Sequence, residues 1–247
     1  MRNADQWRPT KFVIKKHILR ANPDRKQVHL ASRLMVNLVG DCYSGIFEKY
    51  FKGRLIDVGC GNVPFYEAYK NYVNENICVD WAESLHSNLF LDYIADLNEK
   101  LQFEDEEFDT ALLSDVLEHI MNPQLLLTEV FRILRPEGKL VMNVPFFYWL
   151  HEEPHDYYRY TRFMLKKLLV DSGFQKIEIT ALAGAPVVLA DVFAKNVHHI
   201  PLIGNILCRF SQWSCFYFVK TRIGNKISTR TSEKFPLGYM VVAEKSI

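Results

Sequence analysis

Residues 55–65 read LIDVGCGNVPF, an apolar run that reaches an acid at Asp57 and then two glycines, Gly59 and Gly61. The run 54–58 has the composition of a buried β-strand, and Gly59 stops it. Glycines directly after a strand let the backbone turn sharply and leave no Cβ in the path of a ligand. In an open α/β sheet, the carboxyl ends of the strands form the ligand crevice. The stretch therefore predicts a ligand-binding turn at the end of a strand.

The spacing within this turn argues against a nicotinamide dinucleotide as the ligand. The Gly-x-Gly-x-x-Gly fingerprint of dinucleotide-binding proteins needs a third glycine, and Pro64 stands at that place. The carboxylate of Asp57 would also repel a pyrophosphate. A carboxylate in the turn suits a cationic ligand instead, and the ammonium group of an amino acid is one candidate.

Two further acids stand where the next two expected strands end. Asp80 closes the apolar run 76–80, and Asp96 follows the weaker run 89–95. We expect a carboxylate at the tip of the second strand to bind the two hydroxyls of a ribose. We expect Asp96 to accept a hydrogen bond from an adenine amino group. The order along the chain is then a glycine turn, a ribose acid and an adenine acid.

Strand-like and helix-like segments alternate along the chain. The expected strands cover residues 54–58, 76–80, 89–95, 108–113, 139–144, 174–181 and 239–243. Helical patterns occupy residues 24–51, the segment after Pro123, and residues 161–171. The second of these ends in turn residues at 135–138, and Thr161 caps the third. This alternation predicts an α/β, Rossmann-like fold with a seven-stranded, mostly parallel sheet and helices on both faces.

The same pattern divides the chain into four segments. We expect an N-terminal helical extension over 1–52, a Rossmann-like core over 53–183, a helical insert or lid over 184–236 and the last strand of the core sheet over 237–247. The insert combines apolar runs with basic residues, among them Lys220, Arg222, Lys226 and Arg230. It is interpreted as a lid packed on the core, as a surface that contacts lipid or a lipid-linked substrate, or as a dimer face.

The chain resembles the class I S-adenosylmethionine-dependent methyltransferases of the small-molecule, methyltransferase-11-like type. The elements that carry the resemblance are LIDVGCG (55–61), Asp80, the pair Asp96 and Leu97, EFDTALLSDVLEH (107–119) and FRILRPEGKLV (131–141). They occur in order, at intervals that are similar to those of the family. The fold that the family implies is the one that the alternation of segments predicts.

The resemblance implies an enzyme that binds S-adenosylmethionine. The glycine turn would surround the methionine part, Asp80 would hold the ribose hydroxyls, and Trp81 would pack beside the adenine. Asp96 and the backbone of Leu97 would contact the adenine edge, and Ser114 would lie near the methionine end. The implied cofactor-binding residues are Asp57, Gly59, Cys60, Gly61, Asp80, Trp81, Asp96, Leu97 and Ser114.

Methyl transfer from a sulfonium is an in-line displacement, so the protein must mainly align the acceptor. A hydroxyl acceptor also needs a group that takes its proton. The candidate catalytic residues are His119, after the fourth expected strand, and His151 and His155, after the fifth. The loop 151–160 (HEEPHDYYRY) is dense in titratable and aromatic groups, which favours a site. The candidate substrate-binding residues are Tyr148, Asp156, Tyr158 and Arg159.

Other interpretations of these residues stay open. The loop 151–160 is also interpreted as a structural clamp for the helix that starts at Thr161, and His119 as a histidine that caps or packs its own loop. No metal site is expected. The cysteines are widely spaced, and Pro154 disfavours the continuous helix that a metal-binding pair of His151 and His155 would need.

Composition limits the expected partners and location. The net charge of +1 over 247 residues gives no nucleic-acid signature, and the ten acids in 91–120 would repel phosphates beside the expected crevice. The sequence contains no apolar run that is typical of a signal peptide or a membrane span. We expect a cytoplasmic protein that makes peripheral membrane contact through 184–230.

The leading hypothesis for function is methyl transfer from S-adenosylmethionine to a small, lipid-linked or glycan-linked acceptor, as O-methylation. A quinone-type C-methyltransferase shares the same motifs and stays open. A non-catalytic protein of the same fold that acts as a binding partner also stays open. The acceptor, the methylated atom and the oligomeric state are left undetermined by the sequence.

Overall fold

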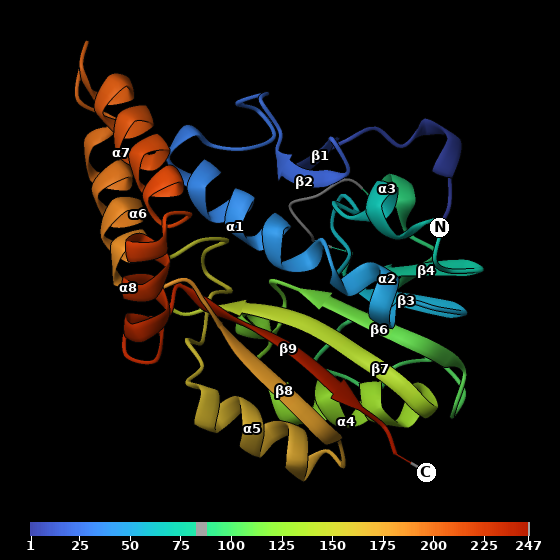
Figure 1. The fold of residues 1–247 in the computed structure, drawn as a ribbon. Coiled ribbons are helices and arrows are strands. Elements are labelled where there is room, and N and C mark those ends of the chain that lie inside the picture. The colour runs from blue at the N-terminus through green and yellow to red at the C-terminus, as the bar shows by residue number, and fades with distance from the viewer. Residues whose placement is uncertain (83–87, 247) are drawn as a thin grey trace. The chain divides into compact units, whose positions relative to one another are not determined.

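The computed structural model describes residues 1–82 and 88–246 and divides the chain into two compact units (Figure 1). The first unit consists of Met1–Arg8, Ile46–Thr180 and Tyr239–Ile247, and the second of Pro9–Gly45 and Ala181–Gly238. Residues 83–87 of the predicted core and residue 247 of the predicted last strand lie outside the described residues. The second unit thus joins parts of two segments that the sequence analysis keeps separate, the N-terminal extension and the insert.

The first unit carries a seven-stranded sheet in the order β5-β4-β3-β6-β7-β9-β8. Its strands are β3 (Arg54–Val58), β4 (Glu75–Asp80), β5 (Tyr93–Ile94), β6 (Phe108–Ser114), β7 (Leu134–Pro145), β8 (Gln175–Leu182) and β9 (Gly238–Glu244). Strands β3 to β7 pair in parallel. Lys245 exchanges backbone hydrogen bonds with Glu137 and Gly138, so the end of β9 lies beside the start of β7 and the two strands are antiparallel. The predicted seven-stranded, mostly parallel sheet is confirmed.

Helices lie on both sides of this sheet (Figure 1). α4 (Pro123–Ile133) and α5 (Arg162–Asp171) lie on one side, and α2 (Ile46–Tyr50) and α3 (Tyr66–Tyr69) on the other. The unit also contains short 3₁₀ helices, η1 (Ala4–Gln6), η3 (Asn88–Phe90) and η4 (Leu117–His119). Because both faces are covered, the central strands are continuous apolar runs, and residues such as Leu55, Ile56 and Leu112 are at most 1% exposed.

The register of the strands aligns their carboxyl ends. Asp57 in β3 lies opposite Cys78 in β4 and Leu112 in β6. Ser114 at the end of β6 lies opposite Asn143 in β7. The segments that follow β3, β4, β6 and β7 therefore leave the sheet at the same edge.

The second unit is built from both ends of the chain. Its elements are the antiparallel hairpin β1 (Phe12–Lys15) and β2 (Ile18–Ala21), η2 (Leu30–Ser32), α1 (Arg33–Tyr43), α6 (Ala185–Val197), α7 (Gly204–Phe218) and α8 (Arg222–Ser232). The Gln212 side chain in α7 accepts a hydrogen bond from the N–H of Leu34 and donates one to the carbonyl of Leu30. Leu30, Ala31, Ala194, Val197 and Cys208 form its buried core.

Some predicted elements differ from the observed ones. The N-terminal extension contains the hairpin β1–β2, whose strands of four residues are too short to show a clear alternating pattern. Within the predicted helical stretch 24–51, the described helices begin at Leu30. Residues 135–138, predicted as a turn, belong to β7, because Glu137 and Gly138 pair with Lys245 at the end of β9. None of the helices among the described residues is long and apolar enough to cross a membrane.

Candidate active site

The glycine turn after β3 is held by the end of β4. The N–H groups of Gly59 and Cys60 both donate to the carbonyl of Val79, at 2.8 and 3.1 Å. Gly59 has a φ of +69°, and a Cβ at this position would lie 2.6 Å from Cγ2 of Val116. Glycine is therefore required at this position both by the backbone conformation and by the packing of the loop after β6.

Asp80, at the end of β4, fixes this turn with its side chain. One carboxylate oxygen accepts a hydrogen bond from the N–H of Gly61 and the other from the N–H of Trp81, both at 2.8 Å. The residue is 8% exposed. A carboxylate offers about four acceptor positions, so Asp80 can hold the turn and accept ligand hydroxyls at once.

Asp57 lies at the end of β3 and is 3% exposed. The hydroxyl of Tyr69 donates to its carboxylate at 3.2 Å. Burial raises the pKa of Asp57 to about 7, and the nearby Asp80 carboxylate adds to the rise, while the hydrogen bond from Tyr69 opposes it. A cation bound beside Asp57 would stabilise its ionised form.

The other predicted cofactor residues are less closely connected. Ser114 is the last residue of β6, and Leu97 is buried. The ring of Trp81 meets the ring of His155 edge-on, with centroids 5.0 Å apart. Asp96 is exposed and accepts hydrogen bonds from the backbone and side chain of Asn98. The roles of these four residues at the cofactor stay predictions.

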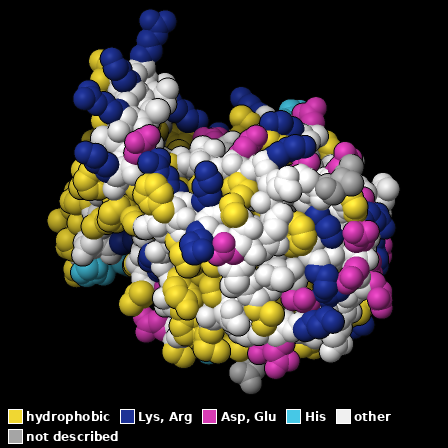
Figure 2. Space-filling model, turned by 90° about the horizontal axis from the view of Figure 1, so that it is seen from below, with side chains coloured by type: hydrophobic (Ala, Val, Ile, Leu, Met, Phe, Trp, Pro, Cys, Tyr) yellow, Lys and Arg dark blue, Asp and Glu magenta, His cyan; other side chains and the backbone are white. Residues whose placement is uncertain are grey.

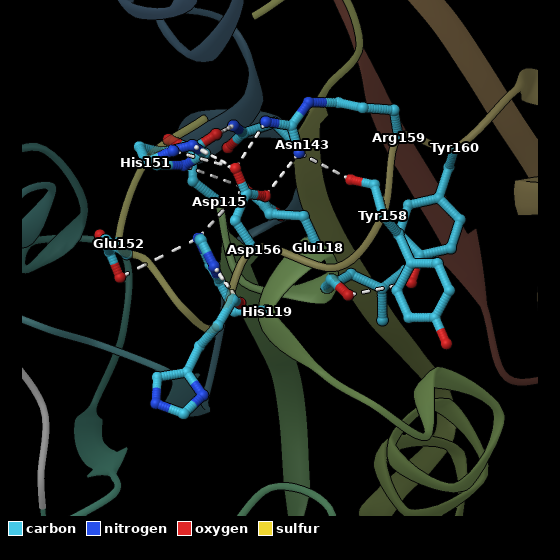
Figure 3. Close-up of polar contacts among 12 residues, drawn as sticks. Asp115, Glu118, His119, Asn143, His151, Glu152, Asp156, Tyr158, Arg159 and Tyr160 are labelled. Atoms are coloured by element: carbon cyan, nitrogen blue, oxygen red, sulfur yellow. Dashed lines mark hydrogen bonds and ion pairs between the residues drawn. The ribbon is translucent and has the colours of Figure 1, made fainter. Parts of the chain in front are cut away.

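A polar network orders the loop after β7 (Figure 3). Arg159 donates to both carboxylate oxygens of Asp156, at 2.5 and 2.7 Å, and also to the carbonyl of Trp149. Asp156 accepts a further hydrogen bond from the N–H of His151. Burial alone would raise the pKa of Asp156, but these hydrogen bonds lower it to about 2. Asp156 and Arg159, predicted to bind substrate, bind each other here and hold the loop.

Aromatic residues complete the loop. The ring of Tyr148 meets the ring of His151 edge-on, with centroids 5.3 Å apart. The hydroxyl of Tyr158 donates to the carbonyl of Met121, and that of Tyr160 to the carbonyl of Leu117. These bonds join the loop after β7 to the segment after β6. The substrate contacts of Tyr148 and Tyr158 stay predictions.

His119 and His151, from these two segments, meet around a buried acid, Glu118 (Figure 3). Their rings are edge-on, with centroids 4.8 Å apart. Oε1 of Glu118 lies 3.7 Å from Nε2 of His119 and 3.9 Å from Nε2 of His151. Burial raises the pKa of Glu118 well above its usual range, and Asp115 adds to the rise. Burial lowers the pKa of His151.

The third predicted catalytic histidine is placed differently. The ring of His155 contacts Trp81, and its Nδ1 lies 2.8 Å from the hydroxyl of Tyr157. It joins the cluster of Glu118, His119 and His151 through its backbone, because its carbonyl oxygen lies 2.9 Å from Nδ1 of His119.

Sequence reasoning missed three polar residues of this region, Asp115, Glu118 and Asn143. Asp115 and Asn143 bind each other through both backbone and side chain at the ends of β6 and β7. Glu118 stands beside His119 in the quoted run 107–119, which is a signal in itself. An acid after a strand is ordinarily solvated, however, and the complete burial of Glu118 is visible in the structure alone.

The glycine turn and its acids fit the cofactor that the sequence implies. Asp57 offers a buried carboxylate for a cationic group, as the ammonium and sulfonium of S-adenosylmethionine require. Asp80 offers hydroxyl acceptors beside a turn whose backbone is fixed. Both acids lie where parallel strands end, the usual place for a ligand in this class of sheet.

The family comparison agrees with this geometry. Residues 56–142, from β3 into β7, match the methyltransferase domain family. Residues 56–142 therefore belong to a methyltransferase domain of the class I S-adenosylmethionine-dependent type. The predicted family, fold, cofactor and enzyme class are thereby confirmed.

Curated relatives share this domain in part. An uncharacterized protein of Methanocaldococcus jannaschii is 29% identical over 140 residues, which cover 52% of this chain and 68% of that protein. A ubiquinone biosynthesis O-methyltransferase of Bartonella bacilliformis is 24% identical over 151 residues, which cover 51% of this chain and 61% of the enzyme. A ubiquinone biosynthesis O-methyltransferase of Maricaulis maris is 32% identical over 105 residues, which cover 38% of this chain and 41% of the enzyme. The chain thus spans about two thirds or less of the length of these relatives.

Solved structures share the fold. A S-adenosylmethionine-dependent methyltransferase of Archaeoglobus fulgidus has a TM-score of 0.53 and 20% identity, and covers 90% of this chain and 95% of its own. The [4+2]-cyclase SpnF has the same TM-score at 15% identity, and the match covers 85% of this chain and 82% of SpnF. Since a cyclase shares the architecture, the fold by itself does not specify which reaction a member performs.

Proposed function

We propose that this methyltransferase domain acts on a hydroxyl oxygen of a small or lipid-linked acceptor. Bound S-adenosylmethionine supplies an electrophilic methyl group on a sulfonium. Asp57, the glycine turn and Asp80 hold the cofactor. The relatives that are ubiquinone biosynthesis O-methyltransferases support oxygen as the methylated atom.

The observation that carries the proposal is the meeting of His119 and His151 at the edge where the cofactor residues lie. The strands that precede them, β6 and β7, follow β3 in the sheet order. A hydroxyl must lose its proton during methyl transfer, and histidine is the usual proton acceptor near neutral pH. Burial lowers the pKa of His151, which favours the neutral form that can accept a proton. Asp156 and Arg159 keep its loop in place.

Transfer of labelled methyl groups tests this function. Incubation of the protein with methyl-labelled S-adenosylmethionine and a cell extract, separated into lipid and aqueous fractions, should label a methyl ether. Because a positioned proton acceptor contributes about 10²–10⁴-fold, His119→Ala and His151→Ala should each lower the rate by roughly that factor. His17→Ala, an exposed histidine of the β1–β2 turn, is the matched control. A product methylated on carbon would support the C-methyltransferase alternative, and cofactor binding without transfer would support the non-catalytic one.

The lipid-linked part of the proposal rests on the helices of the second unit. α7 exposes Ile206, Phe210, Trp213 and Tyr217, which follow the spacing of one helical face and are each more than half exposed. α6 also exposes Leu189, Val192 and Phe193, which are each at least 46% exposed. α8 exposes Arg222, Lys226 and Arg230 at intervals of four residues. Figure 2 shows hydrophobic side chains gathered on the left of the view, where α6–α8 lie, with Lys and Arg among and beside them.

This combination fits the surface of an anionic membrane, or a lipid carrier with a phosphate. Exposed apolar stripes favour the acyl boundary, and each basic residue near an anionic surface contributes about 1 kcal/mol. We therefore expect peripheral membrane contact through 184–230, and an acceptor that is delivered from lipid.

Co-sedimentation with vesicles tests the contact. The protein should bind vesicles that contain phosphatidylglycerol at low salt, and binding should fall as salt rises, because basic side chains are screened. Phe210→Glu should weaken binding roughly 10-fold or more, since an apolar ring worth about 1.5–3 kcal/mol leaves the acyl boundary. Phe163→Glu, at a 73% exposed ring on α5, is the matched control. Equal binding of both variants, or no binding by the unaltered protein at low salt, would contradict the membrane contact.

A further inference from the structure

Glu118 holds a buried carboxyl group whose polar atoms are not satisfied. Its side chain is 0% exposed, and neither carboxyl oxygen has a hydrogen-bond partner among the described residues. Buried polar groups nearly always have partners, because an unpaired one costs free energy. The two groups that face it, Nε2 of His119 and Nε2 of His151, lie at 3.7 and 3.9 Å, beyond hydrogen-bond distance.

An oxygen lies near the other nitrogen of each histidine ring. Nδ1 of His119 lies 2.9 Å from the carbonyl oxygen of His155. Nδ1 of His151 lies 3.2 Å from a carboxylate oxygen of Asp156. The carbonyl oxygen beside Nδ1 of His119 favours the tautomer that carries the proton there, which leaves the lone pair on Nε2. Nδ1 of His151 makes no hydrogen bond among the described residues, and Asp156 is near it as an ion-pair partner only. A carbonyl or carboxylate behind the ring is the usual arrangement around metal-bound histidines.

Acids outnumber cations around the three side chains. Asp115 and Asp156 act electrostatically on Glu118, and Glu152 comes within 4.0 Å of Nε2 of His119. The nearby cation is Arg159, and Asp156 already binds it through both carboxylate oxygens. A buried carboxyl group and two imidazoles that converge in such surroundings would be stabilised by a bound cation.

We propose that Glu118, His119 and His151 bind one divalent transition-metal ion. Their three ligand atoms lie within 4.8 Å of one another. Zinc bound at about 2.0–2.2 Å by nitrogen and oxygen ligands needs these atoms about 3.3 Å apart, so the side chains must close by up to about 1.5 Å when the ion binds. Two imidazoles and one carboxylate suit zinc and its neighbours in the first transition row better than magnesium. His119 and His151 are partly exposed as residues, whereas Glu118 is buried.

This site differs from the pairing considered in the sequence analysis. The sequence places His151 four residues before His155, and Pro154 disfavours the helix that a metal-binding pair of these two residues would need. The structure gives His151 two other partners, which precede it by about 32 positions and come from a different loop. The ring of His155 takes no part in the ligand set.

The role of the ion rests on the proposed function. Three protein ligands leave coordination positions for water or for the oxygen of an acceptor. A bound metal lowers the pKa of such an oxygen and so favours its deprotonation. In that case His119 and His151 act on the proton of the acceptor through the ion that they hold.

Metal binding is measured directly on protein without a polyhistidine tag, after chelator treatment and dialysis. Titration with Zn²⁺ in a calorimeter, and with Co²⁺ followed by its visible absorption, should show one bound ion per chain. Changing residues behind the ligands typically costs about 10–100-fold in affinity, so Glu118→Gln and His151→Gln, which each remove a ligand, should cost at least about 100-fold. His17→Gln is the control and should bind as the unaltered protein does. Circular dichroism confirms that the variants fold.

Absence of binding by the unaltered protein overturns the site, and so does equal affinity in the Glu118→Gln and His151→Gln variants. Methyl transfer is assayed separately, with and without the metal. Stoichiometric binding without any transfer would contradict the proposed function and leave the site intact. Transfer that persists in a chelator, by a protein that binds no metal, would overturn the site and leave the function intact.

Discussion

Replacing Asp80 by alanine is expected to weaken binding of S-adenosylhomocysteine about 5- to 150-fold, which corresponds to about 1–3 kcal/mol. The carboxylate does two things that alanine cannot do. It accepts hydrogen bonds from the N–H groups of Gly61 and Trp81, and these bonds fix the glycine turn. We also assign to it the ribose hydroxyls of the nucleoside. Isothermal titration calorimetry of the variant and the unaltered protein gives the ratio of Kd values.

Two controls separate binding from folding. Asp105→Ala removes an exposed carboxylate that pairs with Arg132, and it should leave the Kd unchanged, because exposed ion pairs contribute about 0–1 kcal/mol to stability. Thermal melting without ligand shows whether Asp80→Ala remains folded. A folded Asp80→Ala variant whose Kd lies within twofold of the unaltered value would refute the ribose assignment.

Replacing Lys195 by methionine is expected to destabilise the second unit by about 3–5 kcal/mol. Lys195 and Asp191 form an ion pair at 2.5 Å within α6, and their side chains are 6% and 2% exposed. Methionine fills the space of the lysine stem but leaves the Asp191 carboxyl buried without its cation. Hydrogen exchange read by mass spectrometry measures the effect, since peptides of α6 and α7 should exchange faster while those of β3 and β6 do not.

The expected loss of stability comes from the Asp191 charge that is left buried without a partner, and a double variant tests this cause. Asp191→Leu combined with Lys195→Met replaces the pair by apolar groups and should recover most of the lost protection, because the desolvation cost disappears with the charges. Lys226→Met removes an exposed lysine of α8 in the same unit and should change exchange little. If the single and double variants exchange equally fast, the loss comes from packing and not from charge.

The sheet and the glycine turn at its edge were predictable from local signals. The run LIDVGCG is apolar, then acidic, then turns on glycines, and in the structure Asp57, Gly59, Gly61 and Asp80 occupy the ends of β3 and β4. Such a signal depends only on residues that are close together in the sequence. Parallel pairing then brings the ends of the strands to one edge without further information.

The cluster around Glu118 was not predictable in the same way. His119 and His151 come from loops after different strands, and hydrogen bonds such as those of Tyr158 and Tyr160 join these loops. No periodic pattern marks which loop residues meet. The second unit escaped prediction for the same reason, since Gln212 binds Leu30 and Leu34 across most of the chain.

The bridge made by Gln212 has a consequence for synthesis of the protein. Leu34 leaves the ribosome 178 residues before its hydrogen-bond partner. At roughly 5–20 residues per second, the N-terminal segment waits about 10–35 s for the helix that covers it. During that interval Leu30 and Ala31 lack the neighbours that α6 and α7 supply, so this part of the second unit completes its core only after α7 has been made.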